Sequence, residues 1–212
     1  MNEAIVKRNA LLGQKVVEAL TRRHFEAYYA GSREEALAKA LELIPKNHSV
    51  GWGGSVSVDE LGLKAALEER GCTLIDRSRA KNREESIEIM RQALVCGTFL
   101  MSANAITEDG ELVNIDGNGN RLAALCFGPQ NVLVIAGMNK VVRDLDAAWS
   151  RARNYAAPVN AQRFDLDTPC CKNGKCGDCL SEQTICAQFV RTRVSKPAGR
   201  IKVILVDEEL GF

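Results

Sequence analysis

Five cysteines lie close together near the C-terminus, and clustered reduced cysteines usually indicate a metal site. They are Cys170, Cys171, Cys176, Cys179 and Cys186. Cys176 and Cys179 form a C-x-x-C pair that can place two thiolates on one ion, and Cys186 with one of the first two cysteines completes four ligands. Four thiolates suit tetrahedral zinc or a [4Fe–4S] cluster. We therefore expect a metal-binding segment over residues 168–187, with reduced thiols that bind no metal as the alternative.

The cysteine spacing leaves the choice of metal open. Cys171, Cys176 and Cys179 have the spacing of a plant-type ferredoxin, but that site needs a distant fourth cysteine. Zinc ribbons use two C-x-x-C pairs, and this segment has one. The other three cysteines, Cys72, Cys96 and Cys126, have apolar neighbours in the sequence, and we expect them to be buried core thiols.

A glycine-rich loop follows an expected strand at residues 49–52. It contains Gly51, Gly53, Gly54, Ser55 and Ser57. Glycines let a backbone approach an anion closely, and free N–H groups and serine hydroxyls supply hydrogen-bond donors. The spacing matches neither the Lys-containing phosphate loop nor the dinucleotide fingerprint. These residues alone favour neither of two interpretations, an anion-binding site or a tight turn that binds no ligand.

A second polar segment spans residues 102–121. Its candidate functional side chains are Asn104, Glu108, Asp109, Asn118, Asn120 and Arg121. A glutamate can serve as a general base or a carboxylate nucleophile, and an arginine can clamp a carboxylate or phosphate with two hydrogen bonds. The alternative is a β-hairpin, because Glu108-Asp109-Gly110 is a good turn sequence. From these residues alone we favour the hairpin.

Alternating short strands and longer helices must position these loops. We expect strands at residues 25–30, 49–52, 72–75, 98–102, 111–115, 131–136 and 201–206, and helices at 1–23, 32–44, 57–69, 82–96 and 145–158. Ser57 and Glu60 form a capping box for the third helix, and Pro158 ends the last one. This order predicts an α/β fold with a mainly parallel open sheet and helices on both faces. We expect a single domain over residues 1–212.

Composition narrows the classes of function. The chain has 212 residues, 46% of them hydrophobic, and a net charge of +1. This charge balance disfavours a nucleic-acid partner. No apolar stretch is long enough to span a membrane and the N-terminus does not look like a signal peptide, so we expect a cytoplasmic protein. The sequence has no nicotinamide or flavin fingerprint, which disfavours an autonomous dehydrogenase.

Taken together, these motifs resemble the lactate-utilisation (LUD) domain proteins, which are related to the C component of the bacterial lactate-utilisation operon. The resemblance covers nearly the whole chain. It is carried by residues 51–55, 105–112, 117–121, 134–142, 168–186 and 210–212. The resemblance implies a fold similar to the sugar-phosphate isomerase, CoA-transferase and formyltetrahydrofolate cyclo-ligase group.

The resemblance also implies roles for particular residues. It favours an anion site at Gly51, Gly53, Gly54 and Ser55. It also favours Glu108 and Arg121 as catalytic residues. It matches the metal set to Cys170, Cys176, Cys179 and Cys186 and leaves Cys171 outside that set. The implied context is lactate oxidation beside iron–sulfur proteins, and a homo-oligomer is compatible with it.

Our first hypothesis is a LUD-family protein that takes part in the utilisation of lactate or another 2-hydroxy acid. Its small anionic substrate would lie between the loop at 51–57 and the segment at 104–121, with Asn104 and Asn118 among its ligands. A second hypothesis is an accessory subunit without catalysis of its own that carries an iron–sulfur cluster or zinc. A third is an isomerase or a CoA-transferase-like enzyme.

Overall fold

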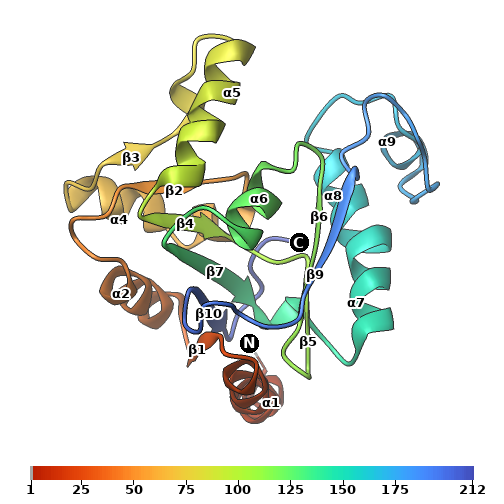
Figure 1. Ribbon diagram of the computed structural model, residues 1–212. Coiled ribbons are helices and arrows are strands. Elements are labelled where there is room, and N and C mark those ends of the chain that lie inside the picture. The colour runs from red at the N-terminus through yellow and green to blue at the C-terminus, as the bar shows by residue number, and fades with distance from the viewer. Residues whose placement is uncertain (1) are drawn as a thin grey trace.

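The computed structural model describes residues 2–212 and contains two β-sheets, which lie side by side (Figure 1). The larger sheet has six strands in the order β1-β10-β7-β4-β2-β3, and all its pairings are parallel. Its strands are β1 (Glu26–Ala30), β10 (Ile201–Val206), β7 (Asn131–Gly137), β4 (Thr98–Met101), β2 (Val50–Trp52) and β3 (Leu74–Ile75). The predicted α/β fold with a mainly parallel sheet is confirmed.

Nine α-helices connect or flank the strands of residues 2–212. They are α1 (Glu3–Arg22), α2 (Arg33–Leu43), α3 (Val56–Glu60), α4 (Leu63–Glu69), α5 (Arg83–Gln92), α6 (Asn120–Cys126), α7 (Leu145–Arg151), α8 (Ala157–Ala161) and α9 (Pro169–Asn173). In this part of the chain no helix is both long enough and apolar enough to cross a membrane.

Side chains of the central strands alternate between two cores, one on each face of the larger sheet. Val203 and Leu205 of β10 pack with α1 and α6. Ile204 and Val206, the residues that follow each of them, pack with α2, α3 and α4. This alternation follows from the two-residue period of a strand, so a continuous apolar run such as residues 201–206 is buried on both faces.

The predicted helix at residues 57–69 is divided in two. Gly62 has a left-handed backbone conformation (φ 72°) that separates α3 from α4. The N-cap of α3 is Ser55, whose Oγ accepts a hydrogen bond from the backbone N–H of Val58 at 3.4 Å. The predicted capping role of Ser57 was therefore wrong.

Pro158 does not end a helix as predicted. α7 continues through a π-helical stretch (Ala152–Ala156) into α8, and Pro158 lies in the first turn of α8. A proline lacks a backbone N–H, but in the first turn of a helix that N–H would have no intrahelical partner. The local π geometry allows the chain to pass through the proline without stopping.

The smaller sheet has the strand order β8-β5-β6-β9. Its strands are β8 (Val141–Val142), β5 (Ala105–Thr107), β6 (Leu112–Asp116) and β9 (Gln188–Thr192). β5 and β6 form an antiparallel hairpin, as favoured for this segment, and Ala105, Val113 and Ile115 pack against α7 through Ala148 and Ala152. The sequence predicted only the strand that corresponds to β6.

Candidate functional site

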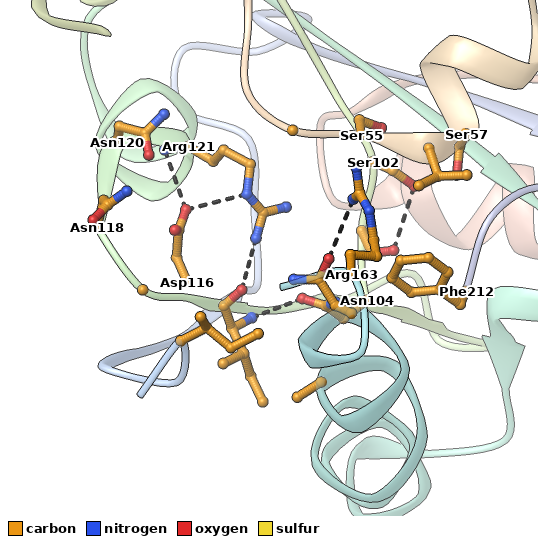
Figure 2. A pocket seen from close by; sticks show the side chains of 18 of the residues that line it. Ser55, Ser57, Ser102, Asn104, Asp116, Asn118, Asn120, Arg121, Arg163 and Phe212 are labelled. Atoms are coloured by element: carbon orange, nitrogen blue, oxygen red, sulfur yellow. Dashed lines mark hydrogen bonds and ion pairs between the residues drawn. The ribbon is translucent and has the colours of Figure 1, made fainter. Parts of the chain in front are cut away.

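A pocket of about 260 Å³ lies where the larger sheet meets the smaller one (Figure 2). Residues that follow the carboxyl ends of three adjacent parallel strands line it: Ser55 and Ser57 after β2, Ser102 after β4 and Lys140 after β7. The segment after β6 and residues around α8 form the remaining walls. Carboxyl ends of parallel strands are the usual ligand-binding edge of an open α/β sheet.

Most of the predicted site residues meet in this pocket. Gly54, Ser55, Ser57, Asn104, Asn118 and Arg121 all line it. Gly51 and Gly53 do not. Gly51 lies in β2, where a Cβ would be 3.0 Å from that of Ala93, so its small size serves packing rather than ligand binding.

Glu108 is not brought to the pocket. It is exposed in the turn of the β5–β6 hairpin, where its backbone N–H donates to the carbonyl of Val142 at 2.8 Å. The turn sequence at residues 108–110 therefore has a structural explanation, and Glu108 has no contact with the pocket. The carboxylate that does line the pocket is Asp116.

Asp116 and Arg121 form an ion pair on one wall of the pocket. Arg121 Nε lies 3.2 Å from Asp116 Oδ2, and Arg121 Nη2 donates to the carbonyl of Ile115 at 2.7 Å. Gly53 makes room for this arginine, because a Cβ at Gly53 would lie 2.2 Å from Arg121 Cγ. Gly53 thus belongs to the site indirectly, as a positioning residue that lets Arg121 approach β2.

Two further pocket arginines have no carboxylate partner in the described part of the chain. Arg163 donates to Asn160 Oδ1 at 3.3 Å and stacks near the rings of Phe164 and Phe212. Arg77 makes its side-chain hydrogen bond to the weak acceptor Met90 Sδ, at 3.4 Å. The side chains of Arg163, Phe212 and the serines lie on one side of the pocket, opposite Asn118, Asn120 and Arg121 (Figure 2).

Lys140 is the most deeply buried cation of the pocket, with an exposed fraction of 3%. Burial is the main cause that lowers the pKa of its amine from 10.5 to about 7, and the positive charges of Arg151 and Arg121 lower it further. Glu60 acts in the opposite direction. The Nζ donates to Ser57 Oγ at 2.9 Å and to Ser102 Oγ at 3.0 Å.

The sequence reasoning missed Lys140, Ser102, Arg77, Arg163 and Phe212. A signal existed for the first two, because Ser102 directly follows β4 and Lys140 lies three residues after β7, and the carboxyl ends of parallel strands converge. Arg77 and Arg163 lie outside the conspicuous motifs, and only the three-dimensional fold brings them to the pocket.

The cysteine segment lies beyond α8 and starts in α9, which is at the outer edge of the molecule (Figure 1). Cys186 is partly buried against the smaller sheet and α7. Burial raises the pKa of its thiol to about 11, and the neighbouring thiols of Cys176, Cys170 and Cys179 contribute to this increase. Cys171 instead directs its Sγ to the carbonyl of Ala161, at 3.3 Å.

The four cysteines of the predicted metal set are therefore electrostatic neighbours, and Cys171 points elsewhere. Within residues 2–212, however, no three His, Cys, Asp or Glu side chains are arranged as ligands of one metal ion. The donor chemistry of four cysteines fits a thiolate-bound metal.

Of the three cysteines expected in the core, only Cys96 is buried. Cys72 is partly exposed and Cys126 is exposed. Cys126 is the last residue of α6, where Ala124 and Leu125 point into the core while the side chains of Cys126 and Phe127 face outward.

Comparisons with solved structures show a shared fold. A crystal structure of a DUF162 family protein from Deinococcus radiodurans aligns over 93% of this chain and 98% of that chain, with a TM-score of 0.54 and 12% identity. Ribose 5 phosphate isomerase A from Neisseria gonorrhoeae aligns over 53% of this chain and 54% of that chain, with a TM-score of 0.34 and 17% identity. The second likeness is too weak to carry an argument.

Sequence comparison identifies the family. No curated protein matches the sequence. A family profile, described as LUD domain, matches residues 13–206 and therefore includes the strand-end loops and the cysteine segment. This chain belongs to the LUD domain family.

Proposed function

We propose that this protein takes part in lactate utilisation and that its pocket binds a small carboxylate, lactate or the corresponding 2-oxo acid. The observation that carries the proposal is the charge balance of the pocket. Three arginines, Arg77, Arg121 and Arg163, line it together with the amine of Lys140, and among the described residues Asp116 is its only carboxylate side chain. Asp116 is already paired with Arg121, so the charges of Arg77 and Arg163 are available to an anionic ligand.

The chemistry of the walls suits a small hydroxy or oxo acid. Arg163 is free of a carboxylate partner among the described residues and can hold a ligand carboxylate with two parallel hydrogen bonds. Asn118 and Asn120, on the opposite side, can hydrogen-bond the hydroxyl or oxo group of the ligand. The volume of about 260 Å³ is suitable for a small molecule.

Titration calorimetry with L-lactate, pyruvate and inorganic phosphate tests this proposal. We expect the carboxylates to bind, and Arg163→Gln to weaken their binding by about tenfold or more, since a hydrogen bond to a charged group contributes about 1.5–3 kcal/mol. Arg143→Gln is the matched control, because the Arg143 side chain is 88% exposed and does not line the pocket. Binding of phosphate alone, or equal loss in both variants, would contradict the proposal.

A specific observation supports a second function for the cysteine segment. The thiols of Cys170, Cys176 and Cys179 are close enough to Cys186 to raise the pKa of its thiol, so the four cysteines lie in one region of the molecule. We propose that these four cysteines hold a [4Fe–4S] cluster, with zinc as the alternative, and that the protein works beside iron–sulfur proteins of lactate utilisation. A bound cluster would supply electron transfer.

Metal and sulfide analysis of protein purified without oxygen tests the second function. We expect iron and acid-labile sulfide in the wild type and their loss in Cys179→Ser. Cys171→Ser is the control, because the Cys171 thiol points to Ala161 and away from the set. Zinc without sulfide would establish the alternative, and protein without metal would contradict both.

A further inference from the structure

The environment of the Lys140 amine limits its protonation state. Ser57 Oγ donates its own proton to the carbonyl of Leu210 at 3.0 Å, and Ser102 Oγ is 3.4 Å from the carbonyl of Ala103. Both hydroxyls therefore accept hydrogen bonds from the lysine. These are the two hydrogen bonds that the described residues provide for Nζ.

Two acceptors match the two N–H bonds of a neutral amine. A neutral Nζ has two N–H bonds and one lone pair, whereas an ammonium group has three N–H bonds and no lone pair. The third N–H of a charged Lys140 would find no acceptor among residues 2–212, in a place where only 3% of the residue is exposed. An unpaired buried donor is costly, so the pocket favours the neutral form, which is the nucleophilic one.

Two of the three charged groups that act on Nζ from other elements also favour the neutral amine. Arg121 at the start of α6 and Arg151 at the end of α7 both repel a positive charge on Lys140, and Glu60 at the end of α3 is the opposing group. At pH 7, a pKa of about 7 in place of 10.5 raises the neutral fraction of the amine by about a thousandfold.

We propose that Lys140 is the reactive amine of this pocket and that it forms an imine with a small 2-oxo acid. This inference rests on the proposed carboxylate pocket and adds a covalent role for one residue of it. The carboxylate of the 2-oxo acid would be held by an arginine of the pocket, which leaves its carbonyl carbon available to Nζ.

The step is a condensation without oxidation or reduction. The lone pair of Nζ attacks the carbonyl carbon, a C–N bond forms, and the carbonyl oxygen takes up a proton to give a carbinolamine. That proton comes from the positively charged nitrogen of the adduct. The remaining N–H proton then passes to the hydroxyl group, the C–O bond breaks, and water leaves as the neutral C=N bond forms. Ser57 and Ser102, which already contact Nζ, are placed to pass these protons.

Trapping with pyruvate and cyanoborohydride at pH 7 tests the inference, because this reagent reduces an imine to a stable secondary amine. After proteolysis, mass spectrometry locates the modified lysine. We expect a carboxyethyl adduct on Lys140 well before exposed lysines such as Lys46 react. Lys140→Arg and Lys140→Met should lose this adduct, while Lys46→Met should retain it. Mapping on the wild-type protein does not depend on whether either Lys140 variant folds.

The outcomes separate this inference from the proposed function. L-lactate has no carbonyl, so it should form no adduct and should slow the labelling of Lys140 by occupying the pocket. If calorimetry shows pyruvate binding but Lys140 is not labelled ahead of Lys46, the imine is refuted and the carboxylate pocket stands. If neither pyruvate nor lactate binds, the proposed function fails, and the inference fails with it.

Discussion

Replacement of Lys140 by methionine should remove a pH dependence from the stability of the fold. The substitution keeps most of the apolar stem of the side chain and removes the amine, which has a pKa of about 7 in the folded protein against 10.5 as its ordinary value. Between these two pH values the unfolded chain binds one proton more than the folded chain. Stability therefore rises with pH in this window, by up to about 1.4 kcal/mol per pH unit.

The size of the effect follows from those two pKa values. For wild type, the free energy of unfolding should increase by about 2 kcal/mol between pH 7 and pH 9 because of Lys140 alone. Below pH 7 the slope disappears, since both states are then protonated. The buried Cys96 and Cys186 thiols, whose pKa values are raised to about 11, act in the opposite direction near pH 9 and above. They are the same in both proteins, so the difference between wild type and variant isolates the lysine.

Urea unfolding at pH 7, 8 and 9, followed by tryptophan fluorescence, measures this difference. We expect the stability of Lys140→Met relative to wild type to fall by about 2 kcal/mol from pH 7 to pH 9, because only wild type gains stability over that range. The control is Lys46→Met, at an exposed position, which should keep the wild-type slope. Parallel pH profiles for wild type and Lys140→Met would refute a neutral buried amine.

Three further substitutions test the assignments around the pocket. Gly53→Ala should displace Arg121, because the Cγ of Arg121 would be 2.2 Å from the new Cβ. We expect calorimetry to show an affinity for lactate that is reduced by about tenfold. An unchanged affinity would contradict the role of Gly53. Glu108→Gln should leave that affinity unchanged, because Glu108 lies in the exposed hairpin turn; a marked loss would return this residue to the site. Glu111→Gln should lower the free energy of unfolding by about 1 kcal/mol at pH 7, because the buried carboxylate accepts two hydrogen bonds from the partly exposed Arg191 and forms an ion pair with Arg23. Arg191 is the main cause that lowers the pKa of Glu111, so this loss should shrink as the pH falls below 4.5, and a constant difference in urea unfolding would contradict it.

The larger sheet could be predicted because its strands and helices have recognisable sequence patterns. The apolar runs at β7 and β10 are buried on both faces, and the helices between strands have clear apolar spacing or serine caps, as at Ser32. The smaller sheet carries little such signal. β8 has two residues, and β9 alternates weakly and is largely exposed, so only pairing in the folded chain defines them.

Pocket residues could be predicted only where a chemically suitable side chain lies within a recognisable sequence motif. Ser57 and Arg121 belong to conspicuous loops and were identified, although Ser57 contacts Lys140 instead of capping α3. Glu108 was predicted to be a site residue, but it lies in a hairpin turn. The local sequence at residues 108–110 is compatible with both, so it could not distinguish them. Arg163 reaches the pocket just after α8, a helix that follows the π-helical stretch at Ala152–Ala156, and no local sequence pattern predicts that path.

A crystal structure of the protein with pyruvate or lactate bound is the most direct test of a carboxylate pocket at the carboxyl ends of β2, β4 and β7. The account predicts ligand density inside this pocket, with the carboxylate against a pocket arginine such as Arg163 and the C2 hydroxyl or oxo group toward Asn118 and Asn120. An empty pocket at saturating ligand, or a ligand bound elsewhere on the molecule, would contradict it.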